Sequence, residues 1–140
     1  MPFQLHITGL LLLSGLLLLS EPKPLIAPPA PTLVSPANGA LMDNGCRPPK
    51  QNNVTWDFDW SDVPGATAYH IRVWRNPALP FINDMNVTSS SYHFDKPQGF
   101  VANNNLTGWR WRVRAKVHGA WGPWSVARSF RVEKLNTDCP

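Results

Sequence analysis

The side chains that catalysis would need are present in this sequence, but their spacing fits no catalytic pattern. His70, His93 and His118 stand more than 20 residues apart, and none has an activated nucleophile beside it. The sequence also lacks the G-x-S-x-G, H-E-x-x-H and phosphate-loop motifs that mark hydrolases, zinc enzymes and nucleotide-binding sites. We therefore predict that the protein is not an enzyme and binds no cofactor.

Three aspartates, Asp57, Asp59 and Asp62, are spaced like the first ligands of a calcium-binding loop. An EF-hand loop also needs a glycine at its sixth position and a glutamate at its twelfth, and neither stands there. We therefore expect these carboxylates to lie on a solvated outer face, and we predict no metal site.

The most regular pattern in the chain lies between Leu106 and Arg131, where apolar and basic residues alternate. Trp109, Trp111, Val113 and Ala115 fall on one side of this alternation, and Arg110, Arg112, Arg114 and Lys116 fall on the other. A period of two predicts a half-buried strand. Its basic side is either a solvated sheet face or a site for a polyanion. The net charge of +4 is modest and no groove-reading basic cluster occurs, so we expect no nucleic-acid partner.

The N-terminus carries a leucine-rich run over residues 10–19, interrupted only by Ser14 and Gly15. A bilayer span needs about 20 apolar residues, so the run is short for one. We predict a signal peptide over residues 1–20, with cleavage between residues 20 and 27; an uncleaved anchor is the alternative. The protein is then exported, either secreted or held at the cell surface or in the periplasm, with no stable membrane span after signal removal.

A proline-dense segment, residues 21–31, separates this run from a domain over residues 32–140. Prolines favour extended backbone, so the segment is expected to be a stiff leader. The two cysteines, Cys46 and Cys139, have no histidines at zinc-site spacing. In an exported protein, an even pair of this kind predicts a disulfide.

Short alternating runs, bounded by proline, glycine and asparagine, fill the rest of the domain. They cover residues 32–36, 54–60, 69–74, 81–87 and 91–95, with two more strands between residues 106 and 132. Residues 37–50 are rich in Asn, Gly and Pro and are expected to form a loop. No segment sustains a helical period. The pattern predicts an all-β fold, an antiparallel sandwich of about seven strands.

Two passages carry a family resemblance. The sequence WSDVPGATAYHIRV, Trp60 to Val73, resembles the second-to-third strand passage of a fibronectin type III domain, and LTGWRWRVRA, which begins at Leu106, resembles its sixth strand. The resemblance covers about residues 32–132 and implies an immunoglobulin-like antiparallel β-sandwich. It also implies that the loop after the first strand and the C-terminus share one pole, which would bring Cys46 and Cys139 together. Trp109 occupies the place of the family's corner tyrosine, whose hydroxyl bonds back to the backbone.

The sequence WGPWS, Trp121 to Ser125, resembles the W-S-x-W-S box of type I cytokine receptors, with Gly122 in place of the first serine. In that family the indole rings interleave with arginines of the neighbouring strand, held by cation–π attraction and stacking. The resemblance implies a Trp/Arg ladder of Arg110, Arg112, Arg114, Trp121 and Trp124. Such a ladder either stiffens the sheet or forms a binding face.

Strand parity places Trp74 on the outer face of a strand, beside His70 and Arg72. An outward indole among polar groups predicts a contact surface for protein or sugar, unless it packs on an arginine stem or on the turn that follows. N-glycosylation sequons begin at Asn53, Asn86 and Asn105.

These observations predict an exported, non-catalytic binding, adhesion or spacer module with a protein or glycan ligand. Two alternatives stay open. One is a soluble domain similar to a type I cytokine receptor. The other is a carbohydrate-binding accessory module, which would present Trp74 and Trp121 as a flat, exposed platform.

Overall fold

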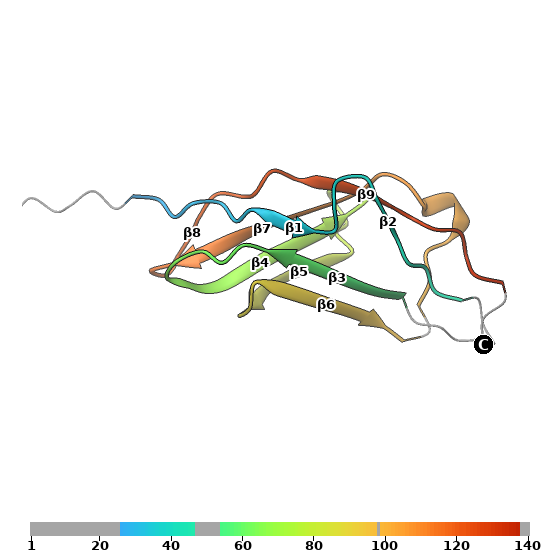
Figure 1. Cartoon of the computed structure of the whole chain (residues 1–140), viewed down its shortest axis with the longest axis horizontal. Coiled ribbons are helices and arrows are strands. Elements are labelled where there is room, and N and C mark those ends of the chain that lie inside the picture. Colours follow the sequence, from blue (N-terminus) through green and yellow to red (C-terminus); the bar gives the residue numbers. More distant parts are fainter. Residues whose placement is uncertain (1–25, 47–53, 98, 138–140) are drawn as a thin grey trace, which may run out of the picture.

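The fold is described by a computed structural model for residues 26–46, 54–97 and 99–137, in which two β-sheets pack face to face (Figure 1). The smaller sheet has the order β1-β3-β6 and the larger has the order β2-β9-β7-β4-β5, with β8 paired to one end of β7. The strands are β1 (Leu33–Ser35), β2 (Ala40–Met42), β3 (Val54–Trp60), β4 (Ala66–Trp74), β5 (Ile82–Val87), β6 (Ser91–Lys96), β7 (Trp109–Val117), β8 (Ala120–Trp121) and β9 (Arg128–Val132).

This architecture confirms the predicted all-β, immunoglobulin-like antiparallel sandwich. The described residues contain nine strands instead of about seven, and their only helical element is a 3₁₀ turn at Asn103–Asn105. The two additional strands, β2 and β8, have three and two residues. β2 falls inside the segment expected to be loop. Its local sequence does not predict a strand, because the strand forms by parallel pairing with β9, ninety residues later in the chain.

Alternation along β3 and β7 builds the core. On β3, Val54, Trp56, Phe58 and Trp60 are all buried, while the residues between them are exposed. The inward rings of the two sheets meet directly: Phe58 lies 5.0 Å from Trp111, centroid to centroid. Burying a large apolar side chain contributes about 1.5–3 kcal/mol, so each ring of this aromatic layer adds substantially to the stability of the sandwich.

Trp109 is tied to the backbone at the start of β7. Its indole Nε1–H donates a hydrogen bond of 2.7 Å to the backbone oxygen of Asn105, four residues upstream. The ring itself is buried and stacks on Phe130 of β9, with centroids 5.8 Å apart. The indole therefore supplies the same kind of backbone tie as the corner tyrosine that the family resemblance implies at this position.

At one pole, the first loop meets the C-terminal segment. Cys46 is buried and forms an isolated parallel bridge with Asn136. Cys139 lies outside the described residues, as do Asn53 and the predicted signal peptide, so the disulfide and the signal peptide stay predictions. Within the described segments, no helix is long and apolar enough to cross a membrane.

Candidate functional site

The outer face of the larger sheet brings together the side chains that the alternating pattern set apart. On β4, His70, Arg72 and Trp74 share this face. β7 runs antiparallel beside β4, and the register places Arg114 opposite His70 and Arg112 opposite Arg72. The predicted contact residues and the predicted ladder arginines therefore lie on one surface, which we call the basic face.

Indole and guanidinium groups alternate along the basic face. The guanidinium of Arg112 lies between Trp74, at 5.3 Å from its ring centroid, and Trp124, at 4.3 Å. The guanidinium of Arg114 lies between Trp124, at 4.5 Å, and Trp121, at 4.9 Å. Each contact falls within the range of about 6 Å in which cation–π attraction acts. The order Trp74–Arg112–Trp124–Arg114–Trp121 is the Trp/Arg ladder of this protein.

The ladder is shifted along β7 relative to the sequence-based expectation. Lys116 closes it, with its Nζ 5.6 Å from the Trp121 ring. Arg110 was expected in the ladder, but no aromatic ring of the described residues lies within cation–π distance of it. Arg110 pairs with Ser129 of β9 and with Trp74 of β4, but the Trp74 ring lies against Arg112. The WGPWS segment lies further along β7. Trp74, contributed by β4, takes the ladder's free end.

Backbone hydrogen bonds hold the WGPWS segment against β7. The amide of Gly122 donates to the oxygen of Ala115, and the amide of Ser125 donates to the oxygen of Val113, both at 2.8 Å. The hydroxyl of Ser125 accepts a 3.0 Å bond from the Val113 amide in return. Ser125 is buried, so this side chain replaces a strand partner instead of facing solvent.

A packing contact explains why glycine occupies position 122 of the WGPWS segment. A Cβ atom placed on Gly122 would come within 2.7 Å of the Pro28 side chain, which belongs to the proline-dense leader. Two non-bonded carbons need about 3.5–4.0 Å, so a side chain at this position would displace the leader. The end of the leader thus lies along the domain, and Pro31 is buried there.

His70 sits beneath the ladder. Its ring centroid is 4.7 Å from that of Trp124, and the side chain is only 5% exposed. Its Nε2 is 2.7 Å from Asn83 Oδ1, and its Nδ1 accepts a 3.2 Å bond from Arg114 Nε. Because Nδ1 accepts, the imidazole is neutral with its proton on Nε2. Burial lowers the pKa of His70, and the nearby arginines lower it further, against the raising effect of the Asn83 bond.

The two outer faces of the sandwich carry opposite charges. Asp57 and Asp59 of β3 and Asp95 of β6 project from the smaller sheet, alternating with buried or half-buried residues. His93 lies among them and pairs with Asp57 at 2.7 Å. The basic face is made by cations that alternate with the buried residues of the larger sheet. They are Arg72, Arg110, Arg112, Arg114, Lys116 and Arg131.

Trp74 is half-buried, with one face toward Arg112, so it is neither fully covered nor a free platform. Arg72 is also half-buried, and its Nη2 donates to the oxygen of Pro77 in the following turn. His70, the third predicted contact residue, is buried below the ladder. The surface open to a partner at this position therefore consists of the edge of Trp74 and the arginines around it.

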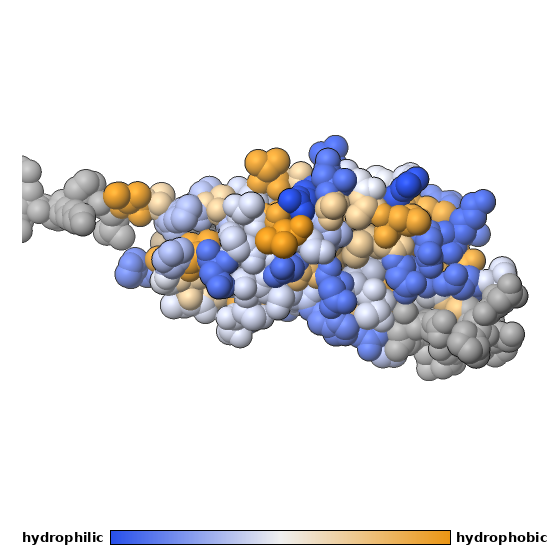
Figure 2. All heavy atoms as spheres, viewed as in Figure 1, coloured by the Kyte–Doolittle hydropathy of each residue, from blue (hydrophilic) through white to orange (hydrophobic). Residues whose placement is uncertain are grey.

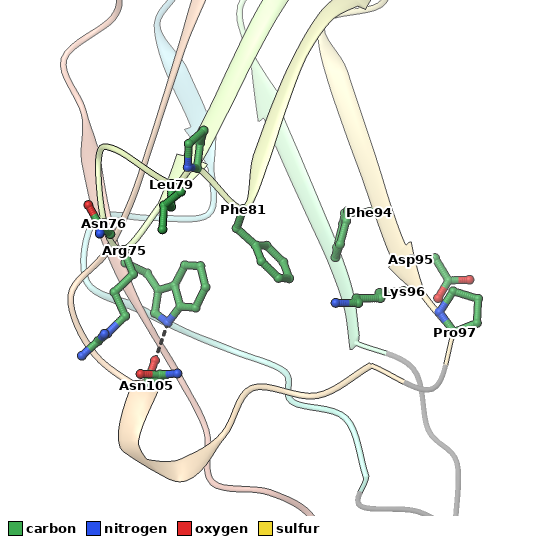
Figure 3. A pocket seen from close by; sticks show the side chains of 11 residues that line it. Arg75, Asn76, Leu79, Phe81, Phe94, Asp95, Lys96, Pro97 and Asn105 are labelled. Carbon is green, nitrogen blue, oxygen red and sulfur yellow. Dashed lines mark hydrogen bonds between the residues drawn. The ribbon is translucent and has the colours of Figure 1, made fainter.

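A cleft of about 630 Å³ opens at one end of the sandwich, beside the β4–β5 turn. Figure 3 shows Phe81 and Phe94 in its wall, with the Lys96 amine pointing toward Phe81. The Lys96 ammonium lies 5.3 Å from the Phe81 centroid. The two rings also pack on each other, 5.2 Å apart, so the cleft wall is part of the aromatic core.

Two of the three sequons fall on described residues. Asn86 lies on β5 and is exposed. Asn105 is half-buried and lines the cleft, and its backbone oxygen is the acceptor of the corner bond. In the described part of the chain, no group of three or more His, Cys, Asp or Glu side chains is arranged to hold a metal ion.

No family model matches the chain, and no curated protein matches it. Among solved structures, the chain is similar to one described as the crystal structure of a Fn3-like protein from Clostridium thermocellum. The two are 23% identical, with a TM-score of 0.49, and the match covers 79% of this chain and 99% of that one. At that identity a likeness concerns the fold alone.

Proposed function

We propose that this protein is an exported, non-catalytic module that binds a partner through the basic face. A fold of this kind hosts many functions, so the proposal rests on the site and not on the architecture. The observation that carries it is the arrangement of Arg72, Arg112 and Arg114 on the outer face of one sheet, where Arg112 and Arg114 contact indole rings and the outward residues of β4, β7 and β9 include no carboxylate.

Export is supported by two features of the sequence. The leucine-rich run at residues 10–19 has the length and position of a signal-peptide core. An even pair of cysteines is also typical of proteins that fold in oxidising compartments. A signal peptide predicts delivery of the domain to the cell exterior or periplasm, where binding and adhesion modules act.

Binding is favoured over a purely spacing role because the basic face keeps its charges unpaired. In the described part of the chain, the only ion pair is His93–Asp57, on the opposite face. A spacer has no need to gather like charges that repel one another. A contact surface for an oppositely charged partner gives this arrangement a physical reason.

A second candidate function is a soluble domain similar to a type I cytokine receptor. The WGPWS segment supports it, because Ser125 binds β7 through its amide and hydroxyl while the indoles interleave with Arg112 and Arg114. A longer transcript or a neighbouring gene that encodes a four-cysteine domain and a membrane span would distinguish this candidate from the first.

The carbohydrate-platform alternative has less support. Trp74 and Trp121 stand at opposite ends of the ladder, with Arg112, Trp124 and Arg114 between them. Their ring faces meet guanidinium groups, so the two indoles do not form one flat, open surface on which sugar rings stack.

The test is a titration of the oxidised, signal-free protein against the strongest hits of a protein and glycan array, followed by tryptophan fluorescence. We expect a saturable shift that Trp74→Ala abolishes at an unchanged melting temperature. Phe100→Ala serves as the matched control, because Phe100 is an exposed aromatic residue outside the sheets. A hit that survives Trp74→Ala and the removal of Arg72 and Arg112 would overturn the proposal.

A further inference from the structure

We propose that the ligand of the basic face is a linear anionic polysaccharide, one that carries carboxylate or sulfate groups along its length. This inference rests on the proposed function and names the chemical class of the partner. Four features of the face support it: its positive charge, the lack of acidic partners for that charge, its linear shape, and the guanidinium groups that cover its indole rings.

The charge of this surface has one sign. Strand alternation places Arg72 on β4, Arg131 on β9 and a row of four cations on β7, while the buried residues between them point into the core. The outward residues of β4, β7 and β9 include no Asp or Glu. The acidic side chains Asp57, Asp59 and Asp95 project from the other sheet. An anionic ligand is therefore attracted to one side of the sandwich and repelled from the other.

The cations of the basic face are not neutralised from within. The hydrogen bonds of Arg72 and Arg114 go to neutral groups, the oxygen of Pro77 and the imidazole of His70. Arg72 and Arg112 stand directly opposite each other on neighbouring strands, where like charges repel. Burial lowers the pKa of Arg112, and repulsion from Arg72 and Arg114 lowers it further. A bound anion would relieve this repulsion.

The shape of the charge distribution fits an extended chain. Arg110, Arg112, Arg114 and Lys116 occupy every second position of one strand. A rise of about 3.3 Å per residue spaces neighbouring cations by about 6.6 Å and spreads the row over about 20 Å. A small ion would use one or two of these cations, whereas a linear polymer with regularly repeated anionic groups meets the whole row at once.

The ladder makes a nucleic acid a poorer occupant than a polysaccharide. Single-stranded nucleic acids bind sheets of this kind by stacking bases on aromatic rings. Here the faces of Trp124 and Trp121 are already covered by Arg112 and Arg114. Polysaccharide carboxylates and sulfates do not need these ring faces, because they can bind the exposed Arg110 and Arg131 and the half-buried Lys116.

A second copy of this chain is the other occupant with the right charge. Its acidic face offers Asp57, Asp59 and Asp95, but Asp57 is already bonded to His93. Fewer carboxylates would then face more cations, so the charge complementarity is incomplete. Figure 2 shows one side of the molecule, where apolar side chains lie in separate groups among hydrophilic ones.

The experiment measures binding of the oxidised, signal-free protein to a heparin dodecasaccharide by surface plasmon resonance, with a neutral dextran of similar length as reference. The test variant is Arg110→Gln/Arg131→Gln, because both residues are exposed and lie outside the ladder. Lys134→Gln/Arg75→Gln is the control, since it removes the same charge from residues outside the strands that form the basic face. We expect heparin to bind and dextran not to bind.

The double variant on the face is expected to weaken heparin binding about two- to fivefold for each charge removed, while the control pair changes it by less than about twofold. Equal losses in both pairs would show unspecific attraction and overturn the inference. Tighter binding of single-stranded DNA than of heparin, or salt-dependent self-association that replaces heparin binding, would overturn it in favour of those partners. If heparin fails but an array hit still depends on Trp74, the polysaccharide class is wrong and the proposed function stands.

Discussion

The Nδ1 atom of His70 accepts a hydrogen bond from the guanidinium of Arg114, which is possible only while the imidazole is neutral. This links the protonation of one buried side chain to the order of the Trp/Arg ladder, because Arg114 is held between Trp121 and Trp124. A second positive charge at this point would face Arg72 on its own strand and Arg112 and Arg114 on β7.

We predict that His70 makes the fold less stable in mild acid. Burial lowers its pKa below the ordinary value of 6.5, so below about pH 6.5 the unfolded chain binds a proton that the folded chain does not. Its contribution to stability is complete above that pH and is lost as the pH falls through the folded pKa. Urea unfolding between pH 7.5 and 5 should show a decline that His70→Gln reduces, since an amide keeps both hydrogen bonds without titrating.

His93 provides a control of opposite sign. Its hydrogen bond to Asp57 raises its pKa, so its contribution is complete below about pH 6.5 and is lost as the pH rises through the folded pKa. His93→Gln should therefore not reduce the acid decline. An acid decline that is identical in the original protein and in His70→Gln would contradict the role given to His70.

A second prediction concerns Gly122 and the leader. Gly122→Ala should lower the stability by about 1–3 kcal/mol, because the new Cβ would clash with Pro28. In a Pro28→Gly background the ring is absent, and the same substitution should cost little. A double-mutant cycle by urea unfolding measures this coupling. If Gly122→Ala costs the same in both backgrounds, the contact with the leader does not explain the glycine.

A third prediction tests the corner bond. Trp109→Phe removes the donor to the Asn105 oxygen, and Trp111→Phe is its matched control, since the Trp111 Nε1 is buried without a partner in the described residues. Both variants lose similar apolar volume. We expect Trp109→Phe to be less stable than Trp111→Phe by about 1 kcal/mol, the contribution of one hydrogen bond. Equal stability of the two variants would contradict this role of Trp109.

A fourth prediction concerns the cysteines. The bridge between Cys46 and Asn136 brings the first loop beside the C-terminal segment, three residues before Cys139 in the sequence. A disulfide there would stabilise the fold by about 2–4 kcal/mol. Reduction should lower the melting temperature, and Cys46→Ser should lower it to the same extent without further sensitivity to reductant. A melting temperature that reductant leaves unchanged would exclude the disulfide.

The sequence allows the sandwich to be predicted because alternation is local. The period of two in β3 and β7 identifies the strands and their inward faces without knowledge of any contact between them. β2 and β8 could not be predicted, because each is only two or three residues long and depends on pairing with another strand. The partner of β2 lies far along the chain.

The candidate site could be predicted in part for the same reason. Parity places Trp74 and Arg112 on outer faces, but only the register of β4 against β7 brings them together. The burial of His70 beneath Trp124 and the contact of Pro28 with Gly122 are non-local, and no spacing in the sequence indicates them. The alternation on each strand predicts an acidic face and a basic face. It does not predict that the two faces lie on opposite sides of one sandwich.

NMR mapping with the heparin dodecasaccharide shows whether the basic face is the binding surface. We expect the Nε–H signals of Arg72, Arg110 and Arg112 and the indole signal of Trp74 to shift on titration, while the amides of β3 and β6 do not. Shifts confined to β3 and β6, or to the cleft around Phe81, would contradict it.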